Sequence, residues 1–250
     1  MSLDRRGWLA GLGASLSTLA LSGCEKLATN PDVVRALSSA EGLNRRVQRL
    51  IGAGALAREY PRADITANFK ANGTIDPPDA DYQAMAAKGF ADWKLVVDGL
   101  VERPLALSLE QLMQLPSRTQ ITRHDCVEGW SCIGEWTGAR MSALMDAAGL
   151  KQQAKHLVLY CADTLGGAKY YETLDLVDVR HPQTILAYAM NGAPLTVPHG
   201  APLRLRAERH LGYKQAKYVM RLQAVASFAH IAGGQGGYWE DRGYERYAGI

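Results

Sequence analysis

Apolar residues along the chain repeat with two different spacings, one typical of helices and one of strands. From Asn30 onward they recur every three or four positions, which predicts a helix with a break near Gly42. Ser108 is a suitable N-cap for a second helix, and Gly149 a suitable end for a third. The later helices are expected at Ser108–Leu115, Met141–Ala148, Thr173–Val179 and Gln183–Met190.

Shorter apolar runs, alternating or continuous, predict strands. They lie at Trp93–Gly99, Gln120–Arg123, His156–Cys161, Leu203–Ala207 and Lys217–Ala226. Asn191-Gly192 is a turn signal, and the residues from Gly233 to Ile250 have the composition of a wrapping or flexible tail. The strands outnumber the helices without alternating regularly with them. This favours an α+β fold with mixed β-sheets and flanking short helices over a parallel α/β sheet.

The first residues have the pattern of an export signal. Arg5-Arg6 precede an apolar run from Trp8 to Leu21, which is shorter than the roughly 20 apolar residues of a confident membrane span. Paired arginines indicate the twin-arginine route, and Leu-Ser-Gly-Cys24 is similar to a bacterial lipoprotein box. A buried N-terminal helix with a chance cysteine is the alternative. We expect a periplasmic or otherwise extracytoplasmic protein, anchored to a membrane by lipid on Cys24.

The export route bears on function. Twin-arginine export carries folded proteins, and a protein needs it when its cofactor is inserted in the cytoplasm. The signal therefore indicates a cofactor before any site residue is considered.

Composition excludes some classes of protein. With 250 residues, 47% of them hydrophobic, the chain can form one domain with a substantial core or two small ones. A net charge of +3 is too mild and too dispersed for nucleic-acid binding. Four cysteines are too few for a disulfide scaffold of this length, so each must be considered separately.

Cys126 has unusual neighbours for a structural cysteine. Such residues normally lie in apolar runs, whereas Cys126 follows Arg123, His124 and Asp125 and precedes Glu128. Nearby positive groups are expected to favour its thiolate, the form that binds metals and attacks electrophiles. This context alone leaves a functional and a structural thiol almost equally open.

Three later segments are rich in glycine and turn residues, and two of them add basic residues. They contain His199, Arg204, Lys214 and Lys217, whose side chains would suit a phosphate or a polar heterocycle that approaches the backbone closely. Each segment taken singly is more often an ordinary solvated turn.

Together these segments carry a specific set of motifs. In order they are Cys-x-x-x-Trp, Trp-Thr-Gly, Tyr-x-Met-Asn-Gly-x-Pro-Leu, His-Gly-x-Pro-Leu-Arg and Gly-Tyr-Lys-x-x-Lys. From about Asp64 to Ser227 the chain resembles the oxidoreductase molybdopterin-binding domain of sulfite oxidases, eukaryotic assimilatory nitrate reductases and periplasmic methionine-sulfoxide reductase catalytic subunits. The resemblance implies a molybdenum–molybdopterin cofactor and two-electron oxygen-atom transfer.

The resemblance also implies roles for individual residues. Cys126 matches the cysteine whose sulfur binds molybdenum beside the dithiolene sulfurs of the pterin, and Tyr170 matches an active-site tyrosine, although Tyr171 makes that register ambiguous. Asp163 and Thr164 both lie near the position of one further cofactor contact in that family. The positions that match cofactor contacts besides Cys126 are Phe69, Lys70, Asn72, Asp163, Thr164, His199, Arg204, Gln215, Ala216 and Lys217.

The chain departs from sulfite oxidases in ways that open the question of substrate. Ala71, beside Lys70, stands where they carry an arginine that holds the anionic substrate, and no immunoglobulin-like dimerisation domain is evident. The sequence has no Cys-x-x-Cys-His haem motif. We therefore expect a small sulfur- or nitrogen-containing substrate and a separate electron-transfer partner, either a c-type cytochrome or a haem membrane subunit.

Other functions remain alternatives. Cys126 with His124 as base would make a thiol enzyme, since residues two apart on a strand share a face. A zinc site with Cys132 added fits no common ligand spacing. A lipoprotein that only binds a partner through a degenerate cofactor fold is the third. The expected parts are a twin-arginine/lipoprotein signal (1–24), an N-terminal helical segment (25–62), a molybdopterin-binding domain (63–232) and a C-terminal tail (233–250).

Overall fold

The computed structural model describes residues 30–52 and 54–250, and these two ranges belong to two separate compact units. The expected signal and Cys24 lie outside the described residues. In the first unit, helix α2 (Pro31–Gly52) begins where predicted, with the side chain of Asn30 accepting from the backbone N–H of Asp32 at 2.9 Å. The predicted break near Gly42 is wrong, because one helix continues through it; a glycine costs a helix only about 1 kcal/mol.

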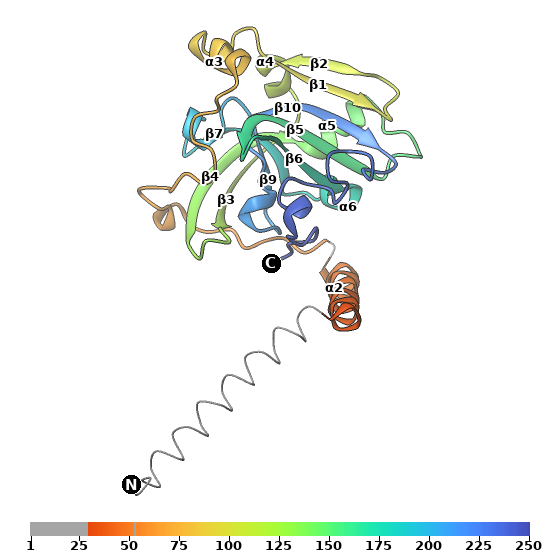
Figure 1. Cartoon of the computed structure of the whole chain (residues 1–250). Coiled ribbons are helices and arrows are strands. Elements are labelled where there is room, and N and C mark those ends of the chain that lie inside the picture. The colour runs from red at the N-terminus through yellow and green to blue at the C-terminus, as the bar shows by residue number, and fades with distance from the viewer. Residues whose placement is uncertain (1–29, 53) are drawn as a thin grey trace, which may run out of the picture. The chain divides into compact units, whose positions relative to one another are not determined.

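The second unit is built around two β-sheets (Figure 1). The first has the strand order β2-β1-β10-β5-β6 and the second β3-β4-β7-β8, with β9 also paired to β7. Only β1 and β10 pair in parallel among these strand pairs, so the first sheet is mixed. The strands are β1 (Lys94–Gly99), β2 (Leu105–Ser108), β3 (Ser117–Asp125), β4 (Ser131–Arg140), β5 (His156–Leu165), β6 (Ala168–Asp175), β7 (Thr184–Met190), β8 (Ala193–Pro194), β9 (Arg204–Ala207) and β10 (Val219–Val225).

Short helices connect the strands, as an α+β fold requires, which confirms the predicted fold class. Ser108 caps α4 through a full capping box with Gln111, and α5 ends at Gly149 in the left-handed conformation, both as predicted. The helices of this unit are α3 (Ala80–Ala87), α4 (Leu109–Met113), α5 (Met141–Ala148) and α6 (Leu176–Val179), and the 3-10 turns are η1 (Arg62–Asp64), η2 (Val197–His199), η3 (Gly212–Lys214) and η4 (Glu240–Arg242).

Two predicted helices are wrong. Gln183–Met190 contains strand β7, and only the end of Thr173–Val179 is helical because Thr173 to Asp175 belong to β6. Strand β7 pairs with β4 and β9, and its first four residues are all buried. A strand buried on both faces has no alternating pattern, so its apolar run cannot be told from a helix by periodicity.

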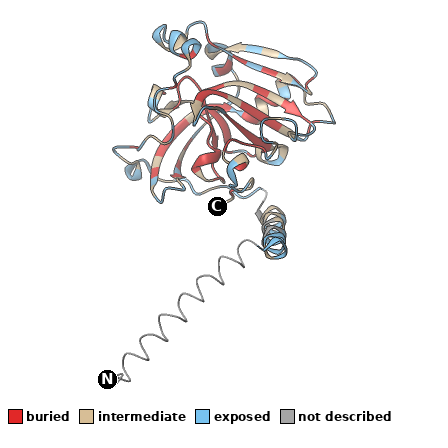
Figure 2. Cartoon of the chain, viewed as in Figure 1, coloured by how far each residue is buried: buried red, intermediate tan, exposed pale blue. Residues whose placement is uncertain are grey.

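The main core lies where the two sheets and α5 meet (Figure 2). Its fully buried members come from both sheets and from α5, and include Leu95, Leu159, Leu222, Leu186, Leu205 and Met145. A smaller cluster contains Phe69, Trp136, Ile185, Ala187 and Leu195. Each large apolar side chain contributes about 1.5–3 kcal/mol by leaving water, which fixes the relative position of the sheets that carry the site. Among the described helices, none has the length and apolar character needed to cross a membrane.

Candidate active site

Cys126 is the first residue of the turn that joins β3 to β4. The two strands pair up to Asp125 and Ser131, and the turn is closed by a hydrogen bond from the Cys126 N–H to the Trp130 carbonyl at 2.9 Å. Gly129 adopts a φ of +83°, which favours glycine there. The hairpin thus presents a half-buried, free thiol at its tip.

The Cys126 thiol lies at a pocket that is partly open to solvent. Segments distant in the sequence meet there: the early loop near Asn72, the end of β5, Tyr170 of β6, and η3 with the residues after it. The lining residues are Asn72, Gly73, Thr74, Cys126, Val127, Glu128, Asp163, Leu165, Tyr170, Gly212, Tyr213, Gln215, Lys217 and Trp239.

Two acceptor atoms in the pocket wall are buried without a hydrogen-bond partner, Oδ1 of Asn72 and Oδ1 of Asp163. Burial raises the pKa of Asp163 to about 6, because desolvation disfavours its charged form. An unpaired buried acceptor costs about 1–3 kcal/mol, so both atoms are suited to receive N–H groups of a ligand. Asp163 and Thr164 were both predicted near one cofactor contact. Asp163 lines the pocket, and Thr164 does not.

Lys217, two residues before β10, is part of the pocket wall. Its Nζ donates to the carbonyl oxygens of Thr74 and, at 2.8 Å, Pro198, so the ammonium group ties the early loop to η2. Burial, followed by repulsion from Arg204, lowers the pKa of Lys217 to about 7. The next residue, Tyr218, has a φ of +56°, a strained conformation for a bulky side chain.

His199, Arg204 and Phe69 do not line the pocket and form a connected group. The His199 Nε2 lies 3.1 Å from the Phe69 carbonyl and its Nδ1 lies 2.9 Å from the Thr196 hydroxyl. The Arg204 Nη1 donates to the His199 carbonyl at 3.1 Å, while its buried Nε and Nη2 have no partner. Burial and the nearby Arg206 lower the pKa of Arg204 to about 9.

Tyr170 and Tyr171 point to opposite faces of β6, which separates their roles. Tyr170 lines the pocket and its hydroxyl donates to the Tyr213 carbonyl, whereas the Tyr171 hydroxyl donates to Asp241 at 2.7 Å. Burial raises the pKa of Tyr170 well above its usual value. Of the two tyrosines, Tyr170 is therefore the one at the pocket.

The remaining predicted residues lie at or near the pocket, but not all of them line it. Gln215 lines the pocket, but its side-chain amide is used by the backbone of Ala207 and His210. Ala216 is buried in the main core. Lys70 is exposed, 3.7 Å from the Glu128 carboxylate and 4.9 Å from the Trp130 ring, beside the Cys126 turn.

Two expectations about charge are wrong. Burial raises the pKa of the Cys126 thiol, because desolvation outweighs the effect of Lys70, and Arg123 pairs with Asp125 instead of facing the thiol. Lys214 does not line the pocket, since it is fully buried between the carboxylates of Glu172 and Glu240. The protein alone thus leaves Cys126 as a thiol, and a bound metal would displace its proton.

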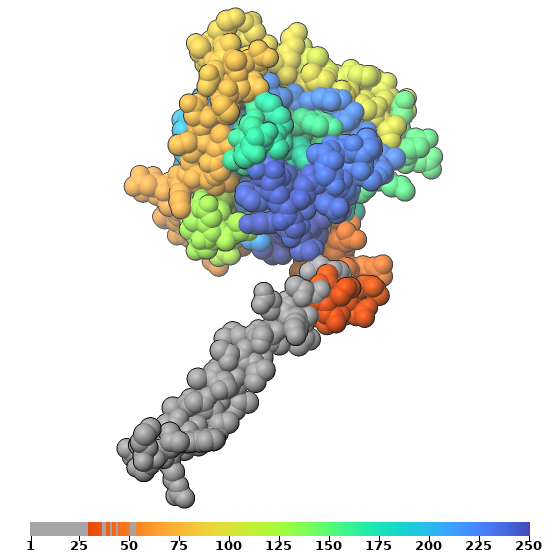
Figure 3. Space-filling view, viewed as in Figure 1, coloured from red at the N-terminus to blue at the C-terminus, as the bar shows by residue number. Residues whose placement is uncertain are grey.

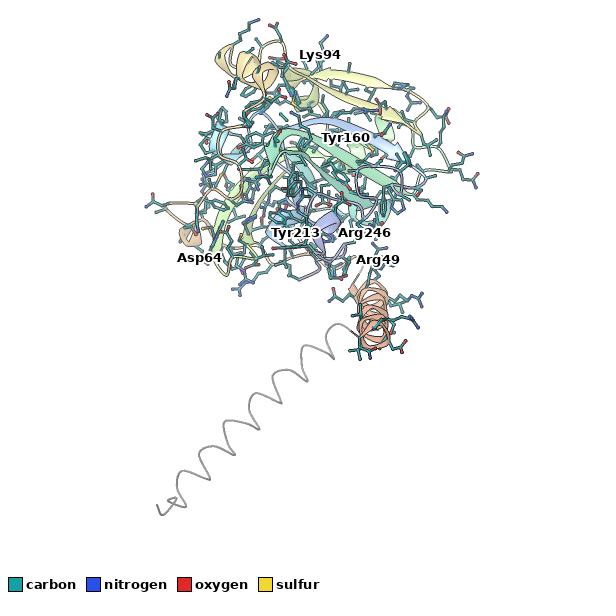
Figure 4. The ribbon with its side chains drawn as sticks, in the orientation of Figure 1. Arg49, Asp64, Lys94, Tyr160, Tyr213 and Arg246 are labelled. Carbon is teal, nitrogen blue, oxygen red and sulfur yellow. The ribbon has the colours of Figure 1, made fainter. Side chains whose placement is uncertain are left out.

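Gly212, Tyr213 and Trp239 line the pocket although sequence reasoning did not single them out as site residues. A methyl group on Gly212 would lie 2.6 Å from Nε2 of His124, so only glycine fits there. Tyr213, marked in Figure 4, follows Gly212 in the Gly-Tyr-Lys motif, which could have indicated it. Trp239 is in the tail, where no motif pointed to it.

The geometry does not support a zinc or a thiol-enzyme site. Among the residues that the structure describes, no three His, Cys, Asp or Glu side chains are arranged to hold a metal ion. His124 is buried with its Nδ1 3.0 Å from Arg206, and burial holds its pKa well below the usual value. It forms no hydrogen bond with Cys126 in the described chain, and so does not act as its base there.

Comparison with known proteins decides the family. Residues 82–230 match the model of the oxidoreductase molybdopterin binding domain. The chain belongs to this family. It is a molybdopterin-dependent oxidoreductase of the sulfite oxidase family, with molybdenum–molybdopterin as its cofactor.

Relatives of this molybdopterin-binding chain include proteins described as sulfoxide reductase subunits. It is 36% identical over 230 residues to a candidate protein-methionine-sulfoxide reductase subunit, YedZ1, of Azospira oryzae, covering 92% of this chain and 81% of that one. It is 31% identical over 182 residues to the methionine-sulfoxide reductase catalytic subunit MsrP of Xanthomonas axonopodis, covering 68% and 56%. The sulfane dehydrogenase SoxCD of Paracoccus pantotrophus superposes with a TM-score of 0.51 at 27% identity, over 54% of this chain and 39% of that one.

The residues present fit this cofactor. The acceptors on Asn72 and Asp163 suit the N–H groups of a pterin, the unpaired donors of Arg204 suit an anionic group, and the free Cys126 thiol suits a soft metal. Each of these groups is costly to leave unpaired in the protein interior, so a ligand that pairs them stabilises the fold.

Proposed function

We propose that this chain is an exported reductase that removes oxygen from small organic sulfoxides, using electrons from a separate haem-containing partner. The observation that carries the proposal is the pocket at Cys126, whose lining combines aromatic and aliphatic side chains with few cationic groups. Lys217 is its one basic lining residue among those the structure describes, and its ammonium is already bound to two carbonyls. Such a pocket suits a neutral sulfoxide with an organic substituent better than a small dianion such as sulfite.

The names of the relatives support the same substrate class. Two of them, at 36% and 31% identity, are described as subunits of methionine-sulfoxide reductases. In the reaction the S=O bond breaks, two electrons come from the partner, and the oxygen leaves as water after taking up two protons. The molybdenum cofactor supplies this two-electron oxygen-atom transfer when it is bound.

The chain's own residues have three tasks in this scheme. Cys126 holds the metal, while Asn72, Asp163 and Arg204 hold and orient the pterin through the unpaired atoms described above. Tyr170 is kept at the pocket by its bond to the Tyr213 carbonyl, which fixes its ring beside an incoming substrate. With a pKa of about 6, the Asp163 carboxyl can also hold or release a proton near neutral pH.

The test is a dye-linked assay on protein purified from a host that makes the cofactor. Reduced viologen should be oxidised when methionine sulfoxide or dimethyl sulfoxide is added, and molybdenum and pterin should be present in equal amounts. Sulfite with an electron-accepting dye should give little activity. A cofactor-loaded protein that oxidises sulfite and leaves sulfoxides untouched would overturn the proposal. A preparation without metal and pterin would favour the partner-binding lipoprotein instead.

We also propose twin-arginine export and a lipid on Cys24, which the Arg5-Arg6 pair and the Leu-Ser-Gly-Cys sequence support. Replacing Arg5 and Arg6 by lysine should leave the folded protein in the cytoplasm. Cys24→Ser should release an exported protein from the membrane fraction and abolish labelling by a fatty acid. Membrane attachment that persists in Cys24→Ser would rule out the lipid anchor.

A further inference from the structure

The C-terminal segment Gly233–Ile250, called the tail below, supplies part of the pocket wall through Trp239. Figure 3 shows these residues in dark blue on the surface, directly beside the lime-green turn that follows β3. The tail lies beyond residues 82–230, the part that matches the family model. Trp239, like the lining residues Asn72, Gly73 and Thr74, therefore lies outside the residues that match the family model.

A buried ionic cluster holds the tail in place. Lys214 Nζ donates to the carboxylates of Glu172 on β6 and Glu240 in the tail, and all three side chains are at most 1% exposed. Glu172 and Gly237 also form a β-bridge. Since Lys214 lies between two pocket residues, Tyr213 and Gln215, the cluster joins the tail to the pocket wall itself.

Aromatic contacts fix the position of Trp239 further. Its ring lies 5.0 Å from that of Tyr244, which in turn lies 5.2 Å from Tyr213. Tyr238 stacks on Tyr170 at 5.5 Å and donates its hydroxyl to the Leu165 carbonyl at 2.8 Å. The tail thus completes an aromatic wall that contains two pocket residues, Tyr170 and Tyr213, besides Trp239.

The pocket lining therefore contains two chemically different sets of side chains. Asn72, Asp163 and Lys217 provide polar groups suited to the cofactor, while Leu165, Tyr170, Tyr213 and Trp239 provide rings and an apolar side chain. A substrate whose oxygen is directed to the metal at Cys126 must place its organic substituent against some part of this wall. Aromatic contact adds about 0.5–1.5 kcal/mol beyond the burial of area.

We infer that Trp239 is a specificity-determining residue, whose indole ring contacts the organic substituent of the sulfoxide and favours bulky apolar substituents over small ones. This inference rests on the proposed sulfoxide reductase function. Trp239 is a substrate-contacting residue here and takes no part in holding the metal.

The first experiment compares Trp239→Ala and Trp239→Phe with the wild-type holoenzyme, normalised to molybdenum content, on dimethyl sulfoxide and methyl phenyl sulfoxide. In Trp239→Ala, kcat/KM for methyl phenyl sulfoxide should fall about tenfold, mainly through KM, while dimethyl sulfoxide changes less than about twofold. Trp239→Phe should keep most of the preference. Tyr247→Ala, a change in the same tail away from the pocket, should leave the ratio unchanged. An equal effect of Trp239→Ala on both substrates overturns the inference.

If the wild-type protein reduces no sulfoxide, the proposed function is wrong, but the contact made by Trp239 can still be tested. The second experiment does this without any enzyme activity. The full-length chain made without cofactor is labelled with iodoacetamide or with a bulky naphthyl maleimide, and Cys126 labelling is followed by peptide mass analysis. Trp239→Ala should lower the rate with the bulky naphthyl reagent several-fold more than the rate with iodoacetamide, and Tyr247→Ala should not. The same rate ratio in Trp239→Ala and wild type would show that the Trp239 ring does not favour a bulky aromatic group beside Cys126, and so overturns the inference.

Discussion

Asp163 and Lys217 line the same pocket, and burial brings their pKa values close together, to about 6 for the carboxyl and about 7 for the ammonium. No ion pair joins them in the part of the chain that the structure describes, since Lys217 is bound to the carbonyls of Thr74 and Pro198. The charged forms of Asp163 and Lys217 therefore each lower the stability of the fold until a ligand pairs with them.

This relationship predicts how the stability of the cofactor-free chain depends on pH. The pKa of Asp163 is raised in the folded state, so its contribution to stability is present below about pH 4 and lost as pH rises through about 6. Asp163→Asn should remove this dependence and raise the free energy of unfolding at pH 7.5 by on the order of 2 kcal/mol. Urea unfolding at pH 5 and 7.5 measures the free energy of unfolding of each variant. Asp92→Asn, which changes an exposed carboxylate, is the control. Equal destabilisation by Asp163→Asn at both pH values would contradict the prediction.

Arg204→Met should have opposite effects on the cofactor-free and the loaded protein. Without cofactor, stability should hold or rise by about 1–2 kcal/mol, because the change removes a buried guanidinium with unpaired N–H groups. Retention of the cofactor, measured as pterin content after gel filtration, should fall.

Arg206→Met is the matched control for Arg204. Its guanidinium is equally buried but pairs with Glu208, so removing it should cost roughly 3–5 kcal/mol by leaving that buried carboxylate without its cation. Wild-type pterin content in Arg204→Met would show that Arg204 does not bind the cofactor.

Cys126→Ser should lower sulfoxide reduction roughly 100-fold and reduce molybdenum content, because a serine oxygen is a poor ligand for a soft, sulfur-rich metal site. Metal analysis and the viologen assay measure the two effects. Cys132→Ala, a buried cysteine on the adjacent strand, should keep its molybdenum. Normal metal and activity in Cys126→Ser would remove Cys126 from the metal site.

Lys214→Met tests the buried cluster that anchors the tail. Removing the ammonium group that Glu172 and Glu240 share leaves two carboxylates together in the interior, which should cost about 3–5 kcal/mol in urea unfolding. Arg180→Met breaks the exposed pair with Asp146 and should cost less than about 1 kcal/mol. Similar small losses in both variants would mean that the cluster contributes little to folding.

Local signals in the sequence were sufficient for elements with a clear boundary or face. Ser108 as an N-cap predicts the start of α4, and Gly149 predicts the end of α5. Strand β7 could not be predicted in this way, because its Ala, Leu and Met residues favour helices while pairing with β4 and β9 makes it a strand. Tertiary contacts of this kind are not encoded in the local pattern.

The site was predictable as a set of residues but not as an arrangement. The motifs brought Cys126, Asn72, Asp163, Tyr170 and Lys217 to attention, and all line one pocket. The order of the motifs along the chain could not show that Arg204 and His199 lie outside the pocket lining. It also could not show that Lys214 pairs with two buried carboxylates instead of facing the pocket. The position of Trp239 could not be predicted for a different reason: it depends on how the tail folds back onto the domain.

The contact between Gly212 and His124 has a mechanical consequence. Because a single added methyl group would reach within 2.6 Å of the His124 ring, the loop that carries Tyr213 and the strand that leads to Cys126 touch with no spare room. Steric contact does not weaken with salt or with protonation, unlike the ion pairs elsewhere in the protein. The spacing between the strand that leads to Cys126 and the loop that carries Tyr213 should therefore behave as a rigid dimension of the molecule, constant over a wide range of acidity and salinity.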